Sequence, residues 1–145
     1  MACYLEEVSK QDSRSYHGAE KNWITLLKKG ENMLTKKKLM IPIFDYSLTI
    51  IIFDDWKELE GYLSKEAFSE PCKGITTFKE GAALVAINAA RGSTIVHESL
   101  HVVNGVWNYI GYEPVRDNDE VSAYLLTYIY DKIVDVFYKH KGNHE

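Results

Sequence analysis

Cysteine is scarce in this sequence. The two that occur, Cys3 and Cys72, lie far apart and form no C-x-x-C pair. A zinc or redox site made of paired thiols is therefore not indicated. A disulfide is not indicated either, and both thiols are expected to be reduced.

Long apolar runs are missing as well. The longest, residues 48–53, is far too short to cross a bilayer. The first ten residues include Glu6 and Glu7 and lack the apolar core of a signal peptide. These absences predict a cytoplasmic protein with no membrane partner.

Excess positive charge is also absent, since the formal net charge is -4 and the pI is about 5.7. Nucleic acid binding needs a positive field to meet phosphate, so no nucleic acid partner is expected. The basic run at residues 36–38 precedes an apolar segment and is interpreted as a solvated edge.

The 145 residues, 46% of them hydrophobic, suffice for one packed domain. Their pattern predicts an α+β fold in which a small antiparallel sheet packs on the last two helices. Residues 1–38 are expected to form an N-terminal helical extension. The expected elements are a helix over 19–34, extended chain over 39–53, a helix that follows Asp54 or Asp55 and ends before Pro71, a hairpin of 75–78 and 82–88, and helices over 94–110 and 118–139.

Several local signals refine these elements. The residues 45–47 indicate either a hairpin turn or a bulge in one long strand. Asp54 or Asp55 is expected to cap the helix that follows it. Gly81 supplies the backbone freedom for the later hairpin, and Gly111 is expected to end the helix before it.

The helix over 94–110 carries the motif His97-Glu98-Ser99-Leu100-His101, which matches H-E-x-x-H. Residues four apart share one helix face, so both imidazoles can reach one metal ion. Glu98 projects about 100° away from His97 and can take a proton from a water molecule at the metal. The pattern predicts Zn²⁺ as the cofactor. The alternative is two ordinary histidines on an amphipathic helix.

A third ligand has to come from elsewhere in the chain. Asn104 and Trp107 stand where a metzincin needs glycine and histidine, so that class is excluded. His140 and His144 lie in a polar tail that is expected to fray. Glu120, at the start of the last predicted helix, is the preferred third ligand.

An alternative role for Glu120 is open. Residues 117–120 form a D-x-x-E capping box, with Asp117 as the N-cap and Glu120 as its partner. Asp117 and Asp119 are interpreted as caps and as partners of the helix dipole rather than as ligands.

Residues 81–131 resemble the gluzincin peptidases, on the H-E-x-x-H helix and on Glu120 followed by Ala123. The segments 97–104, 109–112 and 118–125 are similar to small metallopeptidase-like proteins of bacteriophages and prophages, and more distantly to anti-repressor metallopeptidases of mobile elements. The residues before 81 match no peptidase domain, but one minimal zincin-like domain is expected over 1–145, located in the host cytosol if the protein is phage-encoded. The resemblance implies zinc at His97, His101 and Glu120, with Glu98 as the general base.

The resemblance also implies that residues 82–88 hold an extended peptide or protein substrate by main-chain pairing. Tyr124 or Tyr112 would steady the oxyanion, and Tyr124 is the preferred catalytic partner of Glu98. The predicted function is a zinc-dependent peptidase with a narrow protein target. Two alternatives are a non-enzymatic accessory or inhibitor protein with a structural or binding zinc site, and a hydrolase of a non-peptide bond.

Overall fold

A computed structural model of the chain describes residues 24–29, 32–63 and 72–143. The described elements are β1 (Ile24–Lys29), β2 (Asn32–Ile41), β3 (Tyr46–Phe53), η1 (Trp56–Gly61), β4 (Gly74–Lys79), β5 (Ala82–Asn88), α1 (Thr94–Ile110) and α2 (Glu120–Gly142). The predicted α+β class is confirmed. Among the described residues, no helix is long and apolar enough to span a membrane.

The described strands form one sheet in the order β1-β2-β3-β5-β4. Its pairs are antiparallel except β3 and β5, which run parallel from Ser47↔Ala82 to Phe53↔Asn88. The predicted all-antiparallel sheet is therefore wrong, and the sheet is mixed. The parallel pair arises because β4 takes the outer edge, so that β5 is the strand of that hairpin that lies beside β3.

The predicted helix over 19–34 is wrong wherever the structure describes it. Residues 24–29 and 32–34 belong to β1 and β2, which pair antiparallel from Ile24↔Lys37 to Lys29↔Asn32. The spacing of Leu26, Leu27 and Leu34 fits the period of a helix as well as that of a strand. Pairing between neighbouring segments makes them strands. The predicted helical extension over 1–38 fails over the same residues, and its first part lies outside the described residues.

Both predicted hairpins are present. β2 and β3 are joined by the turn at residues 42–45, so the hairpin alternative is confirmed over the bulge, but the turn comes earlier than the predicted 45–47 because Tyr46 and Ser47 already pair with β2. β4 and β5 are joined at Glu80 and Gly81, and Gly81 has a φ of 67°, which a glycine adopts without strain.

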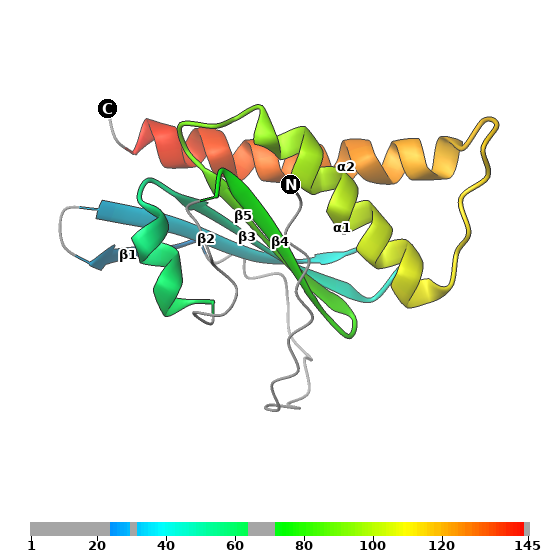
Figure 1. Cartoon of the computed structure of the whole chain (residues 1–145), viewed down its shortest axis with the longest axis horizontal. Helices are drawn as coiled ribbons and strands as arrows, with labels where there is room; N and C mark the ends of the chain where they lie inside the picture. Colours follow the sequence, from blue (N-terminus) through cyan, green and yellow to red (C-terminus); the bar gives the residue numbers. More distant parts are fainter. Residues whose placement is uncertain (1–23, 30–31, 64–71, 144–145) are drawn as a thin grey trace.

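Figure 1 shows α1 and α2 on one face of the sheet and η1 against the other. β3 serves both faces by alternation: Ile50 and Ile52 join the core under the helices, while Ile51 and Phe53 join the cluster around η1. Of the helix predicted after Asp54 or Asp55, the described part is a single 3-10 segment, η1, and residues 64–71 lie outside the described residues. Asp55 caps η1 by accepting a hydrogen bond from the backbone N–H of Lys57 at 3.1 Å.

The two long helices match the sequence closely. α1 begins and ends as predicted, and Gly111 closes it in the left-handed conformation with a φ of 72°. Gly105 lets α1 approach β4, because a Cβ there would overlap the ring of Phe78. The contact between Gly105 and Phe78 therefore helps to set the distance between α1, which carries the motif, and β4.

Candidate active site on α1

The motif lies in the first two turns of α1, which place the two histidines on one face of the helix and Glu98 on another. His97 is exposed and His101 is half-buried, whereas Glu98 is only 4% exposed and points toward β4. Ile95, Val102 and Val106 fill the core side of the same helix. The histidines therefore form a separate stripe along the solvent side of α1, as the periodicity predicted.

The two imidazoles face one another. Their Nε2 atoms lie 3.1 Å apart and their ring centroids lie 4.8 Å apart. Two nitrogens bound to one zinc at about 2.05 Å and separated by this distance subtend about 100°, which is near tetrahedral. The same separation also fits an N–H···N hydrogen bond between the rings, so metal analysis has to distinguish the two.

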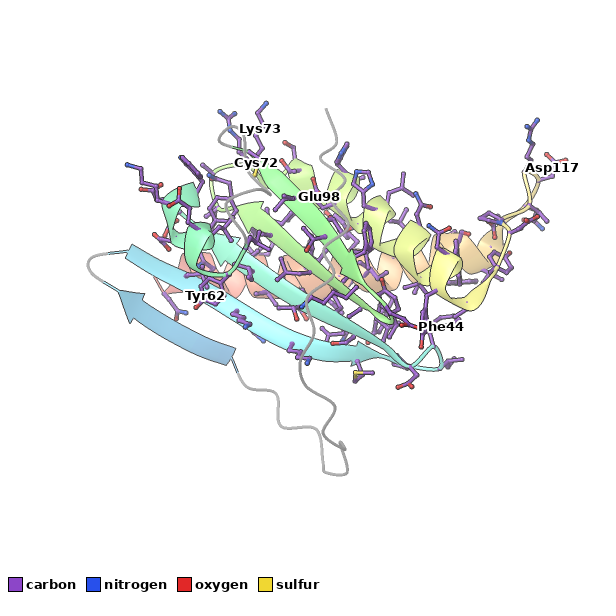
Figure 2. All side chains as sticks on the ribbon, turned by 60° about the horizontal axis from the view of Figure 1, so that its bottom comes forward. Phe44, Tyr62, Cys72, Lys73, Glu98 and Asp117 are labelled. Atoms are coloured by element: carbon purple, nitrogen blue, oxygen red, sulfur yellow. The ribbon has the colours of Figure 1, made fainter. Side chains whose placement is uncertain are left out.

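Glu98 is held from the sheet. The hydroxyl of Thr76 in β4 donates a hydrogen bond to Oε2 of Glu98 at 2.6 Å, and Thr76 is also 4% exposed. Gly74 lies over the other oxygen, since a Cβ there would be 3.2 Å from Oε1 and 3.0 Å from Cγ of Glu98. Both contacts of Glu98 thus come from β4, which begins directly after Cys72 and Lys73, labelled with Glu98 in Figure 2.

Glu120 is not brought to the histidines. It is exposed at the start of α2, two residues before Ser122, whose hydroxyl accepts a hydrogen bond from Nε1 of Trp107 at 2.8 Å. His101 lies six residues before Trp107, which is about 9 Å of helix rise. Within the described part of the chain, no three His, Cys, Asp or Glu side chains form a group that could hold a metal ion.

The predicted N-cap at the start of α2 is wrong by two residues. Asp119, not Asp117, is the N-cap of α2, and its carboxylate accepts from the backbone N–H of Ser122 at 3.1 Å. Glu120 is therefore the first residue of the helix and not the third. Asp117 lies in the loop before it, which Figure 2 shows at the far end of the molecule from Glu98.

The pKa of Asp119 is lowered, first by the hydrogen bond from the Ser122 side chain and also by those from the Ser122 backbone and Tyr112. A carboxyl with a lowered folded pKa stabilises the fold above its unfolded pKa, and this contribution is lost as the pH falls through the folded pKa. We therefore expect Asp119→Ala to lower the melting temperature at pH 7. Below the folded pKa of Asp119 the difference from wild type should shrink, which thermal unfolding across a pH series checks. Asp117→Ala serves as the control, and a constant difference at all pH values would contradict the assignment.

The two tyrosine candidates also lie near the start of α2. Tyr112 donates to Oδ1 of Asp119 at 3.2 Å and packs on Trp107. Tyr124 follows Ser122 by two residues and is 74% exposed. Tyr112 follows the end of α1 directly, and Ser122, two residues before Tyr124, is bonded to Trp107 near that end, whereas the histidines lie in the first turns of α1. The described contacts thus favour neither tyrosine as an oxyanion partner.

The strand proposed for substrate pairing also changes. β5, residues 82–88, is paired on both sides, with β3 and with β4, so it has no free main-chain edge. Among the described strands, the edge next to α1 is β4. Asn88 donates its N–H to the carbonyl of Lys73 at 3.0 Å, and the register then turns the main-chain groups of Gly74, Thr76 and Phe78 away from β5.

His140 is a buried residue that the sequence did not reveal. It was expected in a frayed tail, but it lies in α2 and is 1% exposed. Its Nδ1 lies 2.8 Å from Oγ1 of Thr35, and its Nε2 lies 3.2 Å from both carboxylate oxygens of Asp54. Polar pattern alone gave no signal for it. Thr76 and Gly74 were missed for the same reason, because they reach Glu98 only through the pairing of the sheet.

Comparison with known proteins adds nothing to the assignment of this site. No known protein family matches the sequence, and neither curated proteins nor solved structures show a significant similarity to it.

Proposed function

We propose that this protein is a zinc-dependent hydrolase of the zincin type, acting on a peptide bond. The observation that carries the proposal is the pair of facing Nε2 atoms, 3.1 Å apart, beside a buried glutamate held by the sheet. In a helix, two imidazoles and one carboxylate at this spacing suit a metal-assisted hydrolysis.

The residues present fit zinc in part. His97 and His101 supply two nitrogen ligands with the separation that zinc needs, and the described residues supply no third side chain. When bound, zinc would supply Lewis acidity toward a scissile carbonyl. Catalytic zinc sites use three protein ligands and keep a fourth position open for water, so His97 and His101 would supply two of the three protein ligands.

Glu98 carries the proton transfer in this proposal. Its carboxylate is ordered by Thr76 and sits one residue from His97, on the side of α1 that faces β4. It takes a proton from the attacking water and gives it to the leaving nitrogen. Burial beneath the sheet shields the carboxylate from bulk water, which strengthens its interactions with a bound substrate.

The substrate most consistent with the fold is an extended peptide along β4. The outward main-chain groups of Gly74, Thr76 and Phe78 can pair with such a segment, as an added strand. This edge lies directly above Glu98, whereas β5 is already paired on both sides. β4 would therefore both hold Glu98, through Thr76, and bind the substrate along its free edge.

Metal content tests the proposal directly. Wild type purified without chelators and supplied with zinc is expected to bind one zinc ion per chain. His97→Ala and His101→Ala should each lose it, since a single remaining imidazole binds weakly. Asn104→Ala, on an exposed neighbouring turn of α1, should keep it. Absence of zinc from wild type would overturn the proposal and leave the histidines as a hydrogen-bonded surface pair.

A second candidate is a binding protein that shares its zinc with a partner. The exposure of His97 and the lack of a third ligand among the described residues favour it. One zinc per chain without cleavage of any peptide in a broad library would support this candidate over the hydrolase.

A further inference from the structure

The two carboxylate oxygens of Glu98 have different surroundings. Oε2 accepts a hydrogen bond from the Thr76 hydroxyl at 2.6 Å. Oε1 lies beneath Gly74, which has no side chain to cover it. A Cβ at Gly74 would lie 3.2 Å from Oε1. Glu98 is 4% exposed, so this asymmetry is built into the packing of α1 against β4.

The partner of Oε2 determines which oxygen remains basic. Because the hydroxyl of Thr76 donates, Oε2 already carries one charge-assisted hydrogen bond. A carboxylate oxygen with such a bond is the weaker proton acceptor of the pair. Oε1 retains its lone pairs for a water molecule.

We propose that Thr76 and Gly74 are positioning residues for Glu98, leaving Oε1 as the oxygen that accepts the proton of the attacking water. This inference rests on the proposed function. In the step, an O–H bond of water breaks and its proton forms a bond to Oε1, while the hydroxide oxygen bonds the carbonyl carbon. The C–N bond then breaks and the proton passes from Oε1 to the leaving nitrogen, consuming one water.

Gly74 has a separate part in this arrangement. A side chain there would also meet Cγ2 of Thr94 at 2.6 Å and Cγ of Glu98 at 3.0 Å. An added Cβ would displace the Thr94 methyl group and force the Glu98 side chain to shift by a few tenths of an ångström. Gly74→Ala therefore disturbs Glu98 while leaving the Thr76 hydroxyl intact.

The test compares Thr76→Val, Thr76→Ser, Gly74→Ala and Glu98→Gln with wild type, using the library peptide that wild type cleaves fastest. Valine removes the hydroxyl at nearly constant shape, and serine restores it. We expect Thr76→Val to lower kcat about 10- to 100-fold, the range for loss of one hydrogen bond to a charged group. KM and zinc content should stay unchanged, and Thr76→Ser should recover most of kcat. Gly74→Ala should also lower kcat.

Thr77→Val is the matched control, because Thr77 is the next residue of β4 and its side chain points to the opposite face. Equal losses in Thr76→Val and Thr77→Val would mean that strand stability, not positioning, is affected, and would overturn the inference. Glu98→Gln inactive with Thr76→Val fully active would overturn it too, while leaving the proposed function standing. A wild type without zinc and without cleavage would remove the proposed function and this inference with it.

Discussion

Glu98→Gln is expected to abolish peptide hydrolysis while zinc stays bound. Glutamine keeps the shape of the side chain, and its carbonyl oxygen can still accept the hydrogen bond from Thr76 at the Oε2 position. What it loses is the ability to take a proton from water. Positioned general bases contribute about 10²- to 10⁴-fold to a rate, so kcat should fall by that factor.

Measurements of kcat and of bound zinc on the same preparations check this expectation. Glu113→Gln is the matched control, because it makes the same change at an exposed loop position after α1. Activity in Glu98→Gln within a factor of about two of wild type would exclude Glu98 as the base. Loss of zinc together with activity would instead place Glu98 among the groups that support the metal.

His140→Ala is expected to destabilise the fold by about 3 kcal/mol. Truncation leaves a cavity at a fully buried position and removes the partner of Thr35, which is itself fully buried. It also breaks the contact between α2 and Asp54, directly after β3. For a domain of this size, the loss corresponds to a fall in melting temperature of about 10 °C.

Urea unfolding at constant pH measures this change. Lys139→Ala, the exposed neighbour on α2, should remain within about 0.5 kcal/mol of wild type. A similarly small effect for His140→Ala would show that the last turn of α2 contributes little to the core. Zinc binding by the folded fraction should be unchanged, because His140 lies apart from the motif on α1.

The sequence predicted the parts of the fold that short-range physics decides. α1 has a strong apolar period and a glycine stop, and the β4–β5 hairpin has Gly81 at its turn. The facing histidines follow directly from their spacing on one helix. These features need no knowledge of the remaining chain.

Other features depend on contacts between distant segments. Leu26, Leu27 and Leu34 fit a helix as well as a strand, and only pairing within the sheet selects β1 and β2. Glu120 was chosen for its sequence position, but where α2 begins relative to α1 depends on the packing of its apolar face in the core and on the bond between Trp107 and Ser122. Thr76 could not be linked to Glu98 from the sequence, since the two residues are 22 positions apart and meet only when α1 packs on β4.

The parallel pairing of β3 with β5 also bears on how the chain reaches this fold. Ser47 and Ala82 meet across 35 positions of sequence, whereas the β2–β3 turn closes only the residues between Ile41 and Tyr46. The longer closure costs about 2 kcal/mol more in chain entropy. The hairpin β4–β5 and α1 need no such closure, because they are contiguous. Thr76, Glu98 and the two histidines thus belong to a low-contact-order unit that can form before the two halves of the sheet join.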